Sequence, residues 1–186
     1  MARTLPNVDR RTVIRGLAGA GSLSVIGTAQ ADGSADETVD PELIATVYRL
    51  YSSSQGDHFY TTSQSERNNA IENLGYQDEG IEWIAFDEQR RGTTAVYRLY
   101  SSEQGDHFYT TSASERDNAA NNLGYRKEGV LCYVYDRNRG FNDPVYRLYS
   151  GSQGDHFYTT SSSERDNAVR NLGYRDEGVL GYAFAL

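Results

Sequence analysis

One stretch of sequence occurs three times in this chain, at intervals of 49 residues. Each copy begins Val-Tyr-Arg-Leu-Tyr-Ser, continues to Gly-Asp-His-Phe-Tyr-Thr-Thr-Ser, and ends with Asn-Leu-Gly-Tyr followed by Glu-Gly. A period of this length is typical of repeat architectures, in which one unit cannot bury its own apolar face. The three copies must therefore share a core. They span residues 47–86, 96–135 and 145–184, separated by linkers 87–95 and 136–144.

The first copy contains the alternation that is typical of β-strands. Residues 48–51 and 58–61 are β-branched or aromatic runs whose polarity alternates with a period of two, and a Ser-Ser-Gln-Gly-Asp stretch lies between them. This pattern predicts a β-hairpin closed by a polar turn. Residues 76–86 predict one or two further strands, because aromatic and β-branched side chains follow each other there.

A short helix is predicted between the hairpin and the last strands. Ser63 and Glu66 match the S-x-x-E capping box that begins many helices. Ala70 and Leu74 are one turn apart, and we expect both on the buried side of the helix. Gly75 stands where a helix end favours a residue that can adopt positive φ.

The three copies are alike, whereas an open stack of repeats needs terminal copies with a different, polar outer face. We therefore expect a closed arrangement with pseudo-threefold symmetry, in a single domain over residues 47–186. The fold class is predicted to be mostly β with short helices, as a three-repeat β-trefoil. A β-prism or a propeller-like closure is the alternative.

The N-terminal segment predicts an export signal. Arg10 and Arg11 precede an apolar run rich in Gly and Ala, and residues 29–31 form a small-x-small cleavage pattern. The run is too short and too rich in glycine to span a bilayer comfortably. We expect residues 1–31 to be a twin-arginine signal peptide and residues 32–46 a flexible acidic leader. The protein would then be secreted, with no membrane span in its mature form.

The charge of the chain is strongly negative. The formal net charge is −8, and residues 1–31 contribute +3, so the mature chain would stand at −11. Such a surface repels phosphate backbones, which argues against a nucleic-acid partner. Lys127 is the only lysine. An acidic, lysine-poor surface suits high salt, where screening removes self-repulsion, so we expect a halophilic source.

The single cysteine, Cys132, cannot form an intramolecular disulfide. Its equivalents in the other copies are Trp83 and Gly181, so the three copies share no chemistry at this position. A reactive cysteine needs an activating partner, and we expect Cys132 to be a small buried filler. If these three positions line pockets, only some sites should bind; if they are buried, they reflect drift of the core.

Strand alternation predicts one polar and aromatic patch on each copy. If Leu50 and Phe59 point into the core, the side chains next to them point the other way. Aromatic rings beside planar donors and acceptors suit carbohydrate, since the ring covers the apolar face of a sugar and the polar groups bind its hydroxyls. The candidate ligand-binding residues are Tyr51, Asp57, His58 and Tyr60, then Tyr100, Asp106, His107 and Tyr109, and finally Tyr149, Asp155, His156 and Tyr158.

Each of these residues also has a structural interpretation. The repeated Asp and His could form the turn by bonding backbone groups. Tyr51 and Tyr60 could pack between copies, and Arg49 could pair with Glu79 or Glu66 of its own copy. A threefold axis could also gather the three His into a zinc site, but no second set of ligands supports one, and we predict no metal or cofactor.

The signature Tyr-Arg-Leu-Tyr, Gly-Asp-His-Phe-Tyr-Thr-Thr, Ser-Glu-Arg, Leu-Gly-Tyr, Glu-Gly resembles that of a family of secreted microbial and fungal repeat proteins of unknown function. The resemblance covers residues 47–186. It implies a β-trefoil module of the kind often appended to enzymes that act on cell walls or polysaccharides, and hence a lectin-like role. We expect this chain to depart from that setting, since we predict no catalytic domain in it.

Enzymatic motifs are missing from the sequence. It contains no Gly-x-Ser-x-Gly elbow, no His-Glu-x-x-His helix and no phosphate-binding loop. We therefore expect a monomeric, non-enzymatic module that binds extracellular or cell-surface glycan through equivalent shallow sites, one for each copy. The alternative is a structural or protein-interaction module of the cell envelope with no small-molecule ligand.

Overall fold

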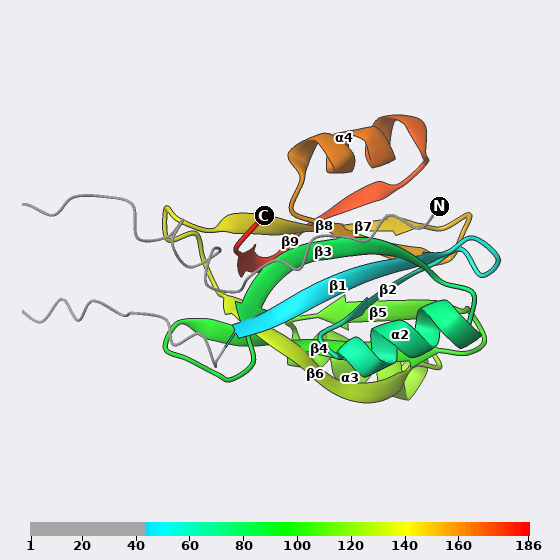
Figure 1. Cartoon of the computed structure of the whole chain (residues 1–186), viewed down its shortest axis with the longest axis horizontal. Helices are drawn as coiled ribbons and strands as arrows, with labels where there is room; N and C mark the ends of the chain where they lie inside the picture. Colours follow the sequence, from blue (N-terminus) through cyan, green and yellow to red (C-terminus); the bar gives the residue numbers. More distant parts are fainter. Residues whose placement is uncertain (1–43) are drawn as a thin grey trace, which may run out of the picture. The chain divides into compact units, whose positions relative to one another are not determined.

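The computed structural model describes residues 44–186 (Figure 1). The predicted signal peptide and residues 32–43 of the predicted leader lie outside this range. Within it the chain is mostly β, with three short helices, as the sequence predicts. No helix in this range is long and apolar enough to cross a membrane.

Every repeat contains the same elements in the same order: strand, strand, helix, strand. The predicted hairpin and helix are confirmed, and the third stretch forms one strand rather than two. The elements are β1 (Ile44–Ser52), β2 (Asp57–Thr61), α2 (Gln64–Asn73) and β3 (Gln77–Phe86), then β4 (Thr93–Ser101), β5 (Asp106–Thr110), α3 (Ala113–Asn122) and β6 (Arg126–Tyr135), and finally β7 (Asp143–Ser150), β8 (Asp155–Thr159), α4 (Ser162–Asn171) and β9 (Arg175–Ala183).

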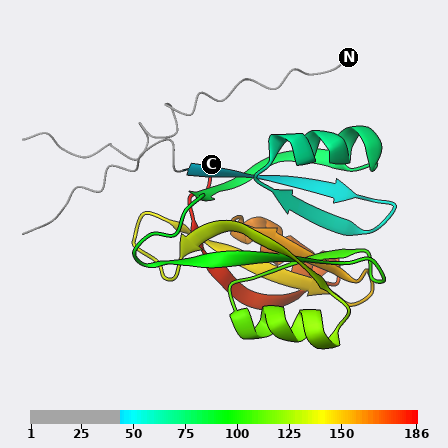
Figure 2. The same cartoon turned by 90° about the horizontal axis from the view of Figure 1, so that it is seen from below.

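Within each repeat the first strand lies between the other two. In the first repeat β1 pairs in antiparallel fashion with both β2 and β3. The β1–β2 turn closes because Gly56 adopts a φ of 72° and its N–H donates to the Ser52 carbonyl at 2.7 Å. A side chain would be strained at this φ, so the glycine is what allows the tight turn. The helices lie outside the strands, with α2 and α3 on opposite sides (Figure 2).

The third strands join the repeats to one another. Strands β3, β6 and β9 each contact the other two, and the nine strands form one antiparallel sheet. The bridges between them are short, so each repeat keeps its own three-stranded unit. The bridging pairs are Phe86 with Tyr133, Tyr135 with Tyr182, and Ile84 with Phe184.

The second strands meet in the shared core that the repeat pattern predicts. Tyr60, Tyr109 and Tyr158 are fully or almost fully buried, and their rings contact one another edge to face. The Tyr60 hydroxyl donates to the Tyr158 carbonyl at 2.6 Å and accepts from the Tyr158 N–H at 2.9 Å. The equivalent bonds run from Tyr109 to Tyr60 and from Tyr158 to Tyr109, so the hydroxyls link all three repeats.

The expectation that Tyr60 faces outward is wrong. Alternation assumes that one face of a strand is exposed, but β2 is covered on both faces. On one face Phe59 packs with Leu50, Ala70 and Tyr76 in the core of its own repeat. On the other face Tyr60 packs against the neighbouring repeats.

The positions that differ between repeats are buried. Trp83 and Cys132 are each 1% exposed, and Trp83 stacks on Tyr60 with ring centroids 5.4 Å apart. A Cβ added to Gly181 would lie 2.4 Å from Cγ2 of Val134, so this position has no room for a side chain. The expected burial of Cys132 is confirmed, and the three different residues reflect drift of the core.

Helix α2 begins as the sequence predicts, but only half of the capping box forms. The Ser63 hydroxyl accepts from the Glu66 N–H at 3.2 Å. The N–H of Ser63 donates to the Thr61 hydroxyl at 3.0 Å. The Glu66 carboxylate therefore does not accept from the Ser63 N–H, as a full capping box would require. It accepts a hydrogen bond from the Thr61 hydroxyl instead.

The end of the helix differs from the prediction in one respect. Ala70 is 1% exposed, as expected, but Leu74 is 53% exposed. Leu74 is the C-cap residue, where the chain leaves the helix, so the helical spacing no longer places its side chain above Ala70. Gly75, with a φ of 76°, ends the helix in the predicted way.

Candidate binding grooves between the repeats

Two open grooves lie at boundaries between repeats. The groove between the second and third repeats, called the second groove, has a volume of about 400 Å³. The groove between the third and first repeats, called the third groove, has a volume of about 210 Å³. Every residue that lines the third groove has its counterpart in the second. The shared positions that carry charge, a ring or an apolar surface in the second groove are Phe108, Glu115, Ala119, Leu123, Tyr125, Arg147, His156 and Glu177.

An arginine pairs with acids from both sides of each groove. The Arg147 guanidinium donates two hydrogen bonds to the carboxylate of Glu115 in the preceding repeat, at 2.8 and 3.1 Å. Its Nε lies 3.1 Å from Glu177 of its own repeat. Burial alone would raise the pKa of Glu115, but hydrogen bonds from Arg147 and Thr110 lower it. The carboxylate therefore stays ionised, and this bidentate pair ties the two repeats together.

The same pairs occur at the other two boundaries. Arg98 binds Glu66 of the first repeat in bidentate fashion, and Arg49 binds Glu164 of the third. The expected pairing of Arg49 with Glu79 inside its own repeat is confirmed at 2.7 Å. The pairing of Arg49 with Glu66 is not found, because Glu66 is taken by Arg98 of the next repeat.

A histidine that lies between two aromatic rings contributes one wall of the groove. The ring centroid of His156 is 4.6 Å from that of Tyr149 in its own repeat and 4.7 Å from that of Phe108 in the preceding one. The His156 side chain is 13% exposed, and its Nδ1 lies 2.7 Å from Oδ2 of Asp106. Because the carboxylate holds Nδ1, the other nitrogen, Nε2, is the one through which this ring can bind a ligand.

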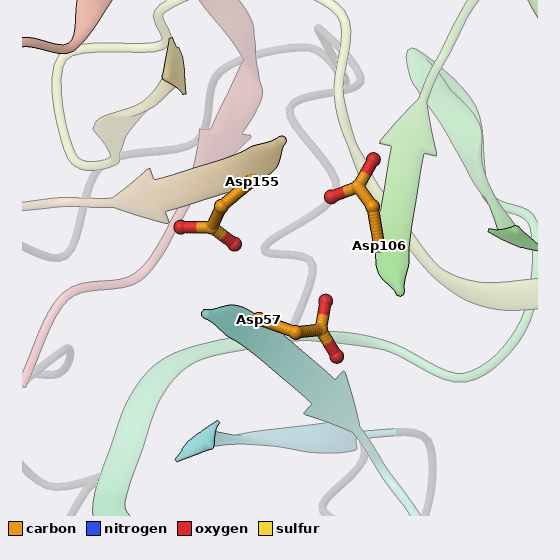
Figure 3. A group of neighbouring side chains, drawn as sticks. All are labelled: Asp57, Asp106 and Asp155. Atoms are coloured by element: carbon orange, nitrogen blue, oxygen red, sulfur yellow. The ribbon is translucent and has the colours of Figure 1, made fainter. Parts of the chain in front are cut away.

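Three carboxylates gather where the repeats meet (Figure 3). Asp57, Asp106 and Asp155 are fully buried at the starts of β2, β5 and β8, and one oxygen of each lies within 4.8 Å of the others. Asp57 accepts hydrogen bonds from the backbone N–H and Nδ1 of His107, at 2.8 and 2.6 Å, and from the Tyr76 hydroxyl at 2.5 Å. The other two carboxylates have equivalent partners.

This arrangement gives the aspartates a role between repeats. The sequence allowed Asp57 to be a turn former or a ligand-binding group, and the structure places it beneath the surface, bonded to the next repeat. Carboxylates this close together have the geometry of a cation site. Each of them already accepts three hydrogen bonds from the protein, which is why we assign no metal to the cluster.

The predicted site residues divide into two groups. The residues of the first group are half-buried at the repeat boundaries: the three His residues with Tyr51, Tyr100 and Tyr149. Of these, His58, His156 and Tyr149 line the grooves. The Asp residues and Tyr60, Tyr109 and Tyr158 lie in the interior.

Sequence reasoning missed the opposite wall of the grooves. The glutamate of this wall, which is Glu66 in the first copy, was predicted to cap the helix or to pair within its own copy, and the Leu of the Asn-Leu-Gly-Tyr motif was predicted on the buried face of the helix. The sequence did contain one signal for this wall: each copy has a leucine at the end of its helix, where a side chain need not be buried.

Comparison with known proteins gives one result. A family model described as a domain of unknown function (DUF5648) matches residues 46–184, which is most of the chain. No curated protein and no solved structure matches the sequence.

Proposed function

The chain belongs to the DUF5648 family of domains of unknown function, and from the residues that line its grooves we propose that it is a non-enzymatic module that binds glycan between its repeats.

The observation that supports this proposal most directly is the composition of the second groove. Phe108 and Tyr149 supply aromatic surface, and Arg147 and His156 supply planar donors beside the carboxylate of Glu115. Ligand sites typically combine apolar walls with a few fixed polar groups. Sugars need this combination, since one face of the ring is apolar and its edge carries hydroxyls. The hydrogen bonds between repeats hold these side chains in place before a ligand arrives.

We further propose that the repeats are arranged about a pseudo-threefold axis, so that each groove takes one wall from each of two repeats. The cyclic bonds of the three core tyrosines support this arrangement. Of the closures considered from the sequence, the propeller-like one agrees better than the β-trefoil with repeats that keep their own three-stranded units. Several weak sites on one molecule would gain affinity for a polymeric glycan through multivalency.

The proposed setting follows from the remaining sequence features. We propose that the protein is exported by the twin-arginine route, acts as a monomer without catalysis, and works at high salt. The acidic composition supports the last point. The protein would then meet glycans outside the cell or on its surface.

One observation favours a second candidate function, a protein-interaction module. Phe141 in the linker before β7 is 55% exposed and stacks on Phe184 with ring centroids 6.2 Å apart. Exposed aromatic side chains of this kind are frequent where proteins bind each other. A protein partner would use this side of the molecule and not the grooves.

A glycan-array screen of the exported protein tests the main proposal, at low and at molar salt. Replacing Tyr51, Tyr100 and Tyr149 together by alanine removes the aromatic ring that packs against the histidine of each repeat. We expect the variant to stay folded, because these rings are only half-buried, and to lose about tenfold or more in affinity. The triple alanine variant of His58, His107 and His156 should behave alike if it folds. Absence of any glycan binding by the folded native protein would favour the interaction module.

A further inference from the structure

The grooves differ at one exposed position. The residue at the start of the third strand is Gln77 in the first repeat but Arg126 and Arg175 in the others. Arg175 lines the second groove, and its guanidinium carbon lies 5.9 Å from the centroid of the Tyr149 ring. Its side chain is 73% exposed and contacts the carboxylate of Glu177 through Nη2 at 2.6 Å. A guanidinium has five N–H donors, so most of them remain available to a ligand.

The third groove is the more negatively charged of the two. Its lining contains Arg49 with Glu79 and Glu164, which is one cation against two carboxylates. Arg49 also lies 2.6 Å from Glu82, a residue that has leucine at the equivalent positions of the other repeats. The second groove instead sets two arginines, at 147 and 175, against the carboxylates of Glu115 and Glu177. An anionic ligand would therefore be repelled by the third groove more than by the second.

The boundary between the first and second repeats matches the second groove in this respect. Arg126 is 74% exposed and binds Glu128 at 2.7 Å, as Arg175 binds Glu177. Arg98 is paired with Glu66 and Glu128 in the way that Arg147 is paired with Glu115 and Glu177. Two of the three boundaries thus present an exposed arginine at the same place.

We infer that the glycan is acidic and that Arg126 and Arg175 determine this specificity, an inference that depends on the proposed glycan binding. A guanidinium binds a carboxylate through two parallel hydrogen bonds, a geometry that neutral hydroxyls do not match. Oligosaccharides of uronic acids supply such a carboxylate on the sugar ring. They bind at the boundaries that carry Arg126 and Arg175, and not at the boundary that carries Gln77.

The net charge of the protein acts against this attraction at long range. The chain as a whole carries −8, so it repels polyanions at low salt. At about 0.15 M salt the screening length is about 8 Å, which leaves direct contacts in the groove while it removes most of the distant repulsion. Binding is therefore best measured at or above this salt concentration.

The test is calorimetric titration with a short oligogalacturonate and with its fully methyl-esterified form, which is neutral. We expect about two sites per chain for the acidic form. The double variant R126Q/R175Q, which copies the natural Gln77, should lose about tenfold or more in affinity for the acidic form. The variant Q77R should bind the acidic form at a third site. The matched control is R170Q, which removes an arginine that is 69% exposed on α4 and that does not line either groove.

The outcomes separate this inference from the proposed function. If both forms bind equally and R126Q/R175Q changes nothing, the acidic specificity is wrong while glycan binding stands. If R170Q weakens binding as much as R126Q/R175Q does, the effect is one of overall charge and the assignment of these two residues is wrong. If neither form binds and no other glycan binds on the array, both the inference and the proposed function are wrong. The substituted side chains are mostly exposed, so the variants should keep the native melting temperature.

Discussion

The Nδ1 atom of His107 lies 2.6 Å from Oδ2 of Asp57, a residue of the preceding repeat. The same pair recurs between His156 and Asp106, and the pair of His58 with Asp155 connects the first repeat to the third. Each carboxylate is fully buried, whereas each imidazole is 13% exposed, and those of His58 and His156 line the grooves. The cohesion of the repeats and the shape of the grooves therefore depend on the same side chains.

Replacing Asp57 by asparagine should destabilise the protein by about 3 kcal/mol. The carboxylate accepts from His107 and from Tyr76, and the amide nitrogen of an asparagine would face donors in place of an acceptor. Urea denaturation measures the loss. Asp136→Asn, at a carboxylate that is 54% exposed, is the control and should change stability by less than about 0.5 kcal/mol. Equal effects of the two substitutions would contradict this role of Asp57.

Replacing Tyr60 by phenylalanine should destabilise the protein by about 2 kcal/mol, although the ring is kept. The change leaves the N–H and the carbonyl of Tyr158 without the hydroxyl that both of them bind. Both groups are buried, so water cannot replace the lost bonds. Thermal unfolding followed by circular dichroism should show a lower melting temperature. An unchanged value would show that the hydroxyl bonds between the three core tyrosines do not stabilise the protein.

The pair of Arg98 with Glu66 should have a measurable coupling energy. A double-mutant cycle with Arg98→Met and Glu66→Gln is expected to give about 1–2 kcal/mol, since the pair is bidentate and partly buried. The pair of Arg170 with Asp166 on α4, in which the arginine is 69% exposed, is the control, for which a much smaller coupling is expected. The prediction is wrong if the two cycles give the same coupling.

Acid should weaken the contacts between repeats. Hydrogen bonds from Arg98 lower the pKa of Glu66, and arginines of the next repeat lower the pKa of Glu115 and Glu164 in the same way, against the effect of burial. A pKa that is lower in the folded state adds stability above the unfolded value of about 4.3. That stability is lost as the pH falls through the folded values. The triple glutamine variant should start less stable at neutral pH and lose less stability on acidification, as measured by urea denaturation.

Cys132 should be unreactive while the protein is folded. Burial raises the pKa of its thiol to about 12, and the side chain is 1% exposed. At about pH 8 a disulfide reagent should therefore label it slowly, and rapidly only after denaturant is added, because the thiolate is the reactive form. Fast labelling of the folded protein would show that this part of the core opens.

The elements that could be predicted from the sequence are those that depend on near neighbours. The β1–β2 hairpin, the Ser63 cap and the helix end at Gly75 each follow from a few adjacent residues. The shared core followed from the repeat itself, since one copy is too small to bury its apolar face. These expectations required no knowledge of how the copies meet.

The candidate site was predicted less well, because its residues have partners in another copy. Local reasoning gave Asp57 to a turn or a ligand site, and Glu66 to a helix cap or to Arg49 of its own copy. Their bonds instead go to His107 and Arg98 of the next repeat. The burial of Tyr60 had the same cause, since alternation within one strand cannot reveal what the neighbouring copy covers. A motif that is the same in all copies cannot indicate which of its side chains reach across a boundary.

The cyclic order of the boundary contacts has a consequence for the number of copies. Each copy offers an acid to the next and receives one from the previous, and the bond of Arg49 with Glu164 returns from the first copy to the third. This cycle of contacts has no first copy. A chain that started with the second copy and ended with the first would therefore keep the same contacts at every boundary. Removing or adding one copy would instead force all the angles between neighbours to change. Related proteins should therefore differ from one another by circular permutation, or by replacement of the complete set of copies, and not by gradual gain or loss of single repeats.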